Sequence, residues 1–211
     1  MLNRLPRVDP TKLSLCAQPF DSPDWVFELE HDGFRVLAYL DNGNCKLISS
    51  RQHAHETFVV LRAALARTGK VQNAILDGEI VFLDSRGRSV YNAVMHSRTA
   101  PVFYAFDLLW LNGKDLRQQP LLSRKRTLYN LISPVKSARL RYSHHIAERG
   151  REFFRIVCEQ DLMGIVAKRR DGSYSNAGWL KIKNPTYRQK DGRKELFEWH
   201  CDKTQSGKGN K

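Results

Sequence analysis

Residues 25–40 read WVFELEHDGFRVLAYL, and this stretch decides the fold. Its first six residues alternate between large apolar side chains and others, which predicts a strand with Glu28 and Glu30 on one face. Asp32-Gly33 predicts a turn, and the apolar run from Phe34 predicts a second strand. The stretch therefore predicts two consecutive strands, the first of which carries two acids on the same face.

The same patterns continue outward along the chain. Further strands are predicted at Cys45–Ser50, Ala74–Leu83, Val102–Trp110, Leu140–Ile146, Gly164–Lys168 and Trp179–Lys183, and helices at Glu56–Arg67, Pro120–Ile132 and Glu148–Gln160. Asp41-Asn42-Gly43-Asn44 is a hairpin signal between two of the strands. The proline-rich residues 1–23 predict an extended segment that wraps the domain. The sequence thus predicts an α+β domain of mostly antiparallel sheets flanked by helices.

The domain organisation follows from where these patterns end. Residues 1–188 are predicted to form one domain. From residue 189 onward, scattered aromatic residues stand among many charges, and the chain ends in Ser-Gly-Lys-Gly-Asn-Lys. This composition predicts that residues 189–211 form a basic, disordered tail or a docking peptide.

The composition indicates a polyanionic partner. The 211 residues include 35 Lys and Arg against 22 Asp and Glu, a net charge of +13. Such a balance favours nucleic acid, nucleotide or an anionic membrane surface, and the alternative is a generally basic, soluble surface. The four cysteines form no Cys-x-x-Cys pair, which argues against a zinc site. The start of the chain is not typical of a secretion signal, so we expect a cytoplasmic protein that does not cross a membrane.

Five segments of the chain carry a further pattern: Glu28–Arg35, Leu76–Glu79, Ala105–Leu109, Met163–Lys168 and Trp179–Lys183. In this order they resemble the motifs of the adenylation (nucleotidyltransferase) domain of ATP-dependent DNA ligases. Each segment alone also fits a plain turn, a core strand or a solvated strand face. Their order and spacing together favour the family. The resemblance implies an ATP-grasp-like fold with antiparallel sheets around a nucleotide cleft.

The resemblance also implies a nucleotide-binding set that uses ATP and Mg²⁺. The set comprises Glu28, Glu30, Arg35, Arg51, Glu79, Phe106, Lys168, Lys181 and Lys183. Within it, Glu28 matches an acid that recognises adenine, and Phe106 matches a ring that stacks on the base. Arg35 and Arg51 match arginines near the sugar and phosphates, and Lys181 and Lys183 match lysines that hold the α-phosphate. Glu79 matches an acid that contacts the ribose or the catalytic metal.

Two positions depart from the family pattern. Glu30 stands where the family has its nucleophilic lysine, so no catalytic residue is assigned. A carboxylate cannot form the phosphoramidate, and each like-charge contact with phosphate at ~4 Å costs about 4 kcal/mol at an effective dielectric of ~20. Met163 replaces a metal-binding glutamate, and a thioether is a poor ligand for Mg²⁺. His31 is expected to point away from Glu30 and not to replace the lysine.

These departures predict a ligase-like domain that does not adenylate itself, a pseudoenzyme of DNA repair or end joining. The family carries an OB-fold after the fifth motif, and the 28 residues that follow Lys183 (211 minus 183) are too few for one. We therefore expect independent nick sealing to fail. The expected partners are nicked or broken DNA ends, with a partner ligase or a Ku-like protein.

Two alternatives stay open. A metal-dependent enzyme of altered chemistry could gather a divalent cation with Glu28, Glu30, Asp32 and Glu79. A non-catalytic scaffold could dock DNA or a protein partner through the tail.

Overall fold

The computed structural model describes residues 5–68, 71–89 and 100–188. The predicted tail at 189–211 lies outside the described residues. None of the helices in the described ranges is both long enough and apolar enough to cross a membrane.

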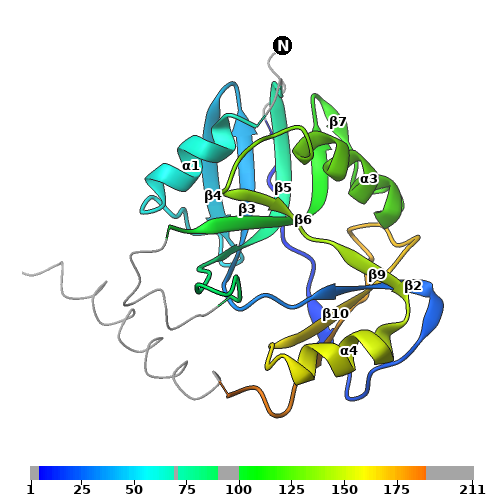
Figure 1. The fold of residues 1–211 in the computed structure, drawn as a ribbon. Coiled ribbons are helices and arrows are strands. Elements are labelled where there is room, and N and C mark those ends of the chain that lie inside the picture. Colours follow the sequence, from blue (N-terminus) through cyan, green and yellow to red (C-terminus); the bar gives the residue numbers. More distant parts are fainter. Residues whose placement is uncertain (1–4, 69–70, 90–99, 189–211) are drawn as a thin grey trace, which may run out of the picture.

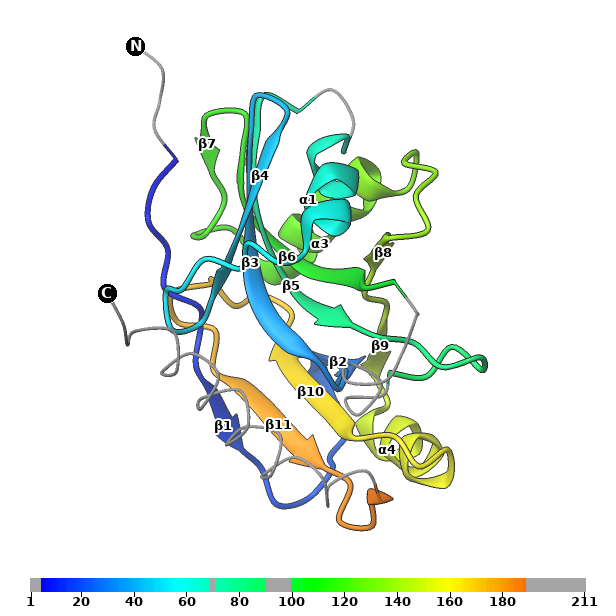
Figure 2. The same cartoon turned by 90° about the vertical axis from the view of Figure 1, so that its left-hand side faces the viewer.

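Two β-sheets form the centre of the molecule (Figures 1 and 2). The smaller sheet has the strand order β1-β11-β10-β2-β9, with β1 at Leu13–Leu15, β2 at Ser22–Leu29, β9 at His145–Glu148, β10 at Gly164–Arg169 and β11 at Trp179–Lys183. The larger sheet has the order β4-β3-β5-β6-β7, with β3 at Phe34–Asp41, β4 at Asn44–Ser49, β5 at Asn73–Val81, β6 at Val102–Leu111, β7 at Lys114–Asp115, and β8 at Leu140–Tyr142 paired beside β6.

In the described ranges, three helices cover the outer faces of the sheets: α1 at Val59–Ala66, α3 at Leu121–Ile132 and α4 at Gly150–Glu159. Helices α1 and α3 pack on the larger sheet, and Leu61 and Leu128 contribute to its main apolar cluster. Helix α4 packs on the smaller sheet, where Val157 meets Phe27. This arrangement confirms the predicted α+β class with helices flanking the sheets.

A third apolar cluster joins the two sheets directly. Leu37 and Leu109 of the larger sheet share it with Val166 and Trp179 of the smaller sheet. The inner faces of the two sheets therefore face each other. Side chains on these inner faces are the ones that can meet in a common site.

Residues 25–40 connect the two sheets. Strand β2 ends at Leu29 in the smaller sheet and β3 begins at Phe34 in the larger one. Gly33 lies between them, and a Cβ there would approach the carbonyl oxygen of Ile80 to 2.2 Å. The Asp-Gly pair therefore meets a steric requirement for close backbone approach, in addition to forming a turn.

The predicted hairpin and the helix at Pro120 are confirmed. Asn42 and Gly43 have φ values of 45° and 76° between β3 and β4, as a type I′ hairpin turn requires. Helix α3 begins directly after Pro120. Helix α1, by contrast, begins at Val59, three residues later than the predicted start at Glu56.

The prediction of one strand over Leu140–Ile146 is wrong. Strand β8 ends at Tyr142 and pairs in parallel with β6, whereas β9 begins at His145 and pairs antiparallel with β2. The chain crosses from the larger to the smaller sheet between them, and an alternating pattern carries no signal for such a crossing. Residues 13–15 of the predicted lead-in also form a strand, parallel to β11.

Candidate functional site

A cavity of about 260 Å³ lies between the inner faces of the two sheets. Seven of the nine residues in the predicted nucleotide-binding set line it: Glu28, Glu30, Arg35, Glu79, Phe106, Lys168 and Lys181. Six of them come from six different strands of the two sheets, and Glu30 directly follows the end of β2. The tertiary fold therefore gathers segments that are up to about 150 residues apart (181 minus 28) into one site.

Glu30 lies inside this cavity and faces a lysine. Its side chain is 5% exposed, and its carboxylate is 2.7 Å from Nζ of Lys181 on β11. The backbone N–H of Glu30 donates to the carbonyl of Gly164 at 2.9 Å, which extends the β2–β10 pairing by one residue and fixes the side chain toward the cavity. The acid at the nucleophile position is thus neutralised by the lysine that the resemblance assigns to the α-phosphate.

Glu28 is held by two ammonium groups. Lys125 donates to its Oε1 at 2.7 Å and Lys168 to its Oε2 at 2.8 Å. Burial by itself would raise the pKa of Glu28, but the two cations outweigh burial and lower the pKa below its usual range. Glu28 is therefore ionised, and both of its oxygens are committed to lysines.

Sequence reasoning missed Lys125. It is 1% exposed on the side of α3 that also carries the buried Leu121 and Leu128. Its ammonium also donates to the carbonyl oxygens of Phe106 at 3.3 Å and Ser143 at 3.1 Å. The available signal was a lysine at i+4 from Leu121 on the apolar face of a predicted helix, because a charge placed there needs a buried partner.

Lys168 covers the predicted stacking ring. Its Nζ lies 4.3 Å from the ring centroid of Phe106 and 4.0 Å from that of Trp179. Burial lowers the pKa of Lys168 to about 8, against the opposing effect of Glu28. A nucleobase can stack on this face of Phe106 only after the ammonium has moved aside.

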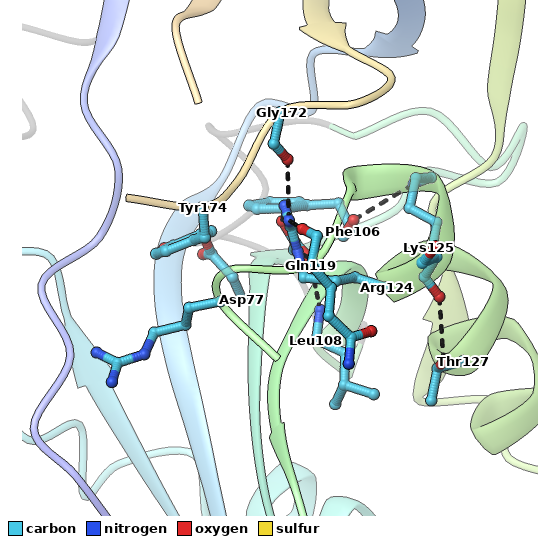
Figure 3. Close-up of polar contacts among 12 residues, drawn as sticks. Asp77, Phe106, Leu108, Gln119, Arg124, Lys125, Thr127, Gly172 and Tyr174 are labelled. Carbon is cyan, nitrogen blue, oxygen red and sulfur yellow. Dashed lines mark hydrogen bonds and ion pairs between the residues drawn. The ribbon is translucent and has the colours of Figure 1, made fainter. Parts of the chain in front are cut away.

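Arg35 is anchored by an acid on the neighbouring strand. It forms two hydrogen bonds with Asp77, at 3.1 and 2.7 Å, and a third with the carbonyl of Thr11 at 2.7 Å. Tyr174 donates to the same carboxylate at 2.7 Å, and Figure 3 shows Tyr174 beside Asp77. Burial by itself would lower the pKa of Arg35, but the carboxylate of Asp77 outweighs burial, and the pKa lies above its usual value.

Glu79 differs from the other acids of the cavity because it is neutral. Burial, together with the nearby carboxylates of Glu30 and Asp77, raises its pKa to about 8, although Arg35 and Lys181 oppose this. At neutral pH the group is therefore mainly a protonated carboxyl, which donates a hydrogen bond and coordinates metal poorly.

The donor set does not fit Mg²⁺. Glu28 and Glu30 are paired with lysines, Glu79 is protonated, and Met163 offers only a thioether to the cavity. Across the described ranges, no three His, Cys, Asp or Glu side chains are placed to hold a metal ion. We therefore derive no step through a metal at this site.

The structure does not bring Arg51 and Lys183 to the cavity. Arg51 is exposed in the turn after β4, an edge strand of the larger sheet. Lys183 is exposed at the end of β11, one alternation beyond Lys181. The direction expected for His31 is wrong, because this residue lies after the end of β2 at Leu29, where strand alternation no longer applies. His31 lines the cavity and packs on Tyr104, and burial lowers its pKa to about 4, which keeps it neutral.

A second ionic network supports the cavity from behind β6. Arg124 of α3 donates twice to Asp107 at 2.8 Å, and both side chains are fully buried. Arg124 also donates to the carbonyl oxygens of Gly172 and Gln119 (Figure 3). This network fixes α3 against β6 and thereby places Lys125 beside Glu28.

The family model of the ATP-dependent DNA ligase domain matches residues 10–183. The chain belongs to this family. It is 32% identical over 185 residues to the multifunctional non-homologous end joining protein LigD of Pseudomonas aeruginosa, which covers 83% of the chain and 22% of that protein. It is also 32% identical over 209 residues to DNA ligase 4 of Candida albicans, with 80% of the chain and 22% of that protein covered. The chain thus spans about a fifth of the length of these relatives.

The solved structures agree with this assignment. A mycobacterial DNA ligase D complexed with ATP and MES superposes with a TM-score of 0.74 at 29% identity, over 83% of this chain and 60% of that one. The ligase-type fold that the motifs implied is therefore confirmed.

Proposed function

We propose that this chain is a DNA ligase-like nucleotidyltransferase domain that acts in DNA repair by end joining and does not form a covalent adenylate. Its cavity binds the phosphates of a nucleotide or of a DNA end without transferring AMP to the protein. The similarity to LigD and to DNA ligase 4 supports the end-joining context. Nicked or broken DNA ends are the proposed substrate class, in company with a partner ligase or a Ku-like protein.

One observation carries the non-adenylating part of the proposal. The carboxylate of Glu30 occupies the nucleophile position and lies 2.7 Å from Nζ of Lys181. Self-adenylation requires a neutral amine that attacks the α-phosphorus while pyrophosphate leaves. A carboxylate at this position supplies no such amine, and its pairing with Lys181 leaves Arg35 and Lys168 as the cavity's main cations for phosphate.

The test measures intact protein mass after incubation with ATP and Mg²⁺. We expect no adenylyl adduct on the unaltered chain. The double variant Glu30→Lys/Met163→Glu should gain one adenylyl group, because Arg35, Lys168 and Lys181 still line the cavity. The new lysine would lie beside Lys181, and repulsion between the two ammonium groups lowers the pKa of the new amine toward the reactive range.

The matched control is Glu30→Gln/Met163→Glu, which removes the same acid but supplies no amine. It should remain unmodified. An adduct on the unaltered chain would overturn the proposal. A folded Glu30→Lys/Met163→Glu variant that neither binds ATP nor gains mass would contradict the retained phosphate site.

The tail remains part of the proposal as a separate unit. We propose residues 1–188 as the ligase-like domain and residues 189–211 as a docking segment for the protein partner. Deletion of 189–211 should leave the thermal unfolding midpoint of the domain unchanged and abolish partner binding. Partner binding that persists after the deletion would exclude the tail as the docking element.

The alternative of a metal-dependent enzyme is not favoured by the site. Glu28 and Glu30 are neutralised by lysines, and Glu79 is protonated. Asp32 does not line the cavity and accepts a hydrogen bond from Tyr187 at 2.8 Å. A thermal shift with millimolar Mg²⁺ or Mn²⁺ would reopen this alternative.

A further inference from the structure

One continuous part of the chain carries only positive charge. Between Asp115 and Glu148 the sequence holds no Asp or Glu, yet it includes two His and seven Lys or Arg: Arg117, Arg124, Lys125, Arg126, Lys136, Arg139 and Arg141. This part contains α3, β8 and the start of β9.

Three of these cations are neutralised by acids elsewhere. Arg117 pairs with Asp115, Arg124 with Asp107 and Lys125 with Glu28. Arg126 is exposed on α3, and no carboxylate of the described ranges lies within ion-pair distance of it. Its charge is therefore available to a ligand.

A pocket of about 400 Å³ opens beside Arg126, between α3 and the segment that connects β8 to β9. Figure 1 shows α3 and β9 next to each other at this side of the molecule. Among the residues that the structure describes, the rest of the lining is aromatic, basic or apolar and contains no acid: Leu122, Lys125, Tyr129, Tyr142, His144 and His145. A pocket of this composition favours an anion that also carries a flat apolar surface.

The aromatic rings of this pocket pack against one another. Tyr129 and Tyr142 meet edge to face with centroids 5.3 Å apart, and Tyr142 meets His144 in the same way at 5.1 Å. Tyr129 is 47% exposed, so part of its ring is open to a ligand. Because the rings hold one another, a planar ligand can stack here at a small cost in side-chain entropy.

Lys125 lies at the floor of the pocket, and its charge is not available to a ligand. All three protons of the Lys125 ammonium are used, by Glu28, Phe106 and Ser143. The ammonium lies 4.8 Å from the ring centroid of Tyr142, which holds that ring in place. The binding charge therefore lies at the rim, on Arg126.

We propose that this pocket binds one nucleotide of a single-stranded nucleic acid. The base stacks on the exposed part of the Tyr129 ring, and the adjoining phosphate pairs with Arg126. Single strands offer open base faces to aromatic side chains, whereas in a duplex these faces are covered by neighbouring bases. The site is separate from the inter-sheet cavity, because the Lys125–Glu28–Lys168 ion pairs lie between them.

The test is fluorescence anisotropy of the full chain with a labelled oligothymidine, in the absence of ATP. Tyr129→Ala should weaken binding about tenfold, since base–aromatic stacking typically contributes on that order. Tyr129→Phe keeps the ring and should stay within about twofold of the unaltered chain. On a blunt duplex, Tyr129→Ala should have no effect.

Arg126→Ala should weaken binding and reduce the slope of log affinity against log salt by about one unit. The charge-matched control is Arg155→Ala on α4, an exposed arginine that pairs with Glu159. It should change affinity by less than about twofold. Equal losses for Arg126→Ala and Arg155→Ala would reduce the effect to overall charge and overturn the proposal.

No loss with Tyr129→Ala, or the same loss on the duplex, would also overturn it. Circular dichroism of each variant confirms that the fold is intact, which the exposure of Tyr129 and Arg126 favours. Because the assay contains no ATP, its outcome is independent of the adenylation test.

Discussion

The Asp107–Arg124 pair and the Glu30–Lys181 pair both contain a buried acid, yet they lie in different surroundings. Asp107 and Arg124 are fully buried, and carbonyl oxygens accept the other hydrogen bonds of the guanidinium. Glu30 and Lys181 face a cavity, and Lys181 is 28% exposed. The first pair holds helix α3 to the larger sheet, whereas the second sets the charge of a site.

The difference shows that residues within one set of family motifs perform two kinds of work. Asp77 and Asp107 belong to segments that resemble ligase motifs, but each binds an arginine within the protein. Glu30, Lys168 and Lys181 present their charges to the cavity instead. The comparison predicts that substitutions in the first group change stability and those in the second change ligand binding.

The largest expected effect is on stability. Arg124→Ala leaves the buried Asp107 carboxylate without its partner, which should lower the free energy of unfolding by about 3–5 kcal/mol. The control Arg117→Ala breaks the exposed pair with Asp115 and should cost about 0–1 kcal/mol. Urea denaturation measures both, and similar losses for the two variants would break the distinction.

The next effect is a pH dependence of stability that arises in the cavity. The pKa of Glu79 is about 8 in the folded state, against 4.5 as the reference value. Below pH 4.5 Glu79 is protonated in both the folded and the unfolded state. As the pH rises from 4.5 to 8, Glu79 loses its proton in the unfolded state but keeps it in the folded state, so the free energy of unfolding falls. The slope from this group is at most about 1.4 kcal/mol per pH unit.

His31, whose pKa is lowered from 6.5 to about 4, makes stability rise with pH up to about 6.5 and so opposes the fall there. Glu79→Gln should therefore remove the fall between about pH 6.5 and pH 8, as followed by urea denaturation at several pH values. Lys168 does not mask the effect. Its pKa is lowered from 10.5 to about 8, so its contribution makes stability rise above pH 8. An unchanged pH profile in Glu79→Gln would show that the carboxyl is not protonated in the cavity.

The smallest expected effect is on ligand binding, and it tests the role of the Glu30–Lys181 pair. Glu30→Gln removes one negative charge and frees Lys181 for phosphate, so the affinity for ATP should rise by about tenfold or more, or about 1.4 kcal/mol. The control Glu159→Gln removes an exposed acid on α4 and should have little effect. Isothermal titration calorimetry measures the ATP affinity of both variants. An unchanged affinity in Glu30→Gln would show that the Glu30–Lys181 pair stabilises the fold and does not control ligand binding.

Much of the fold was predictable from local patterns, and the predictions that failed have a common cause. The β3–β4 hairpin follows from the Asn-Gly turn, and α3 begins directly after Pro120. The single strand predicted over Leu140–Ile146 became two strands in two sheets. Likewise, Lys125 was overlooked because its partner Glu28 lies 97 residues away. Local periodicity reports which side chains share a face, but it does not report what that face meets.

The sequence by itself determined the family and the absence of an amine at residue 30, since both depend only on the order and identity of residues. It also determined that Glu28 and Glu30 share a strand face, because side chains alternate along a strand. Only the tertiary structure decided which cation neutralises each acid. Ion pairing depends on distances of about 3 Å between atoms of different strands and helices, and those distances exist only once the two sheets have packed together.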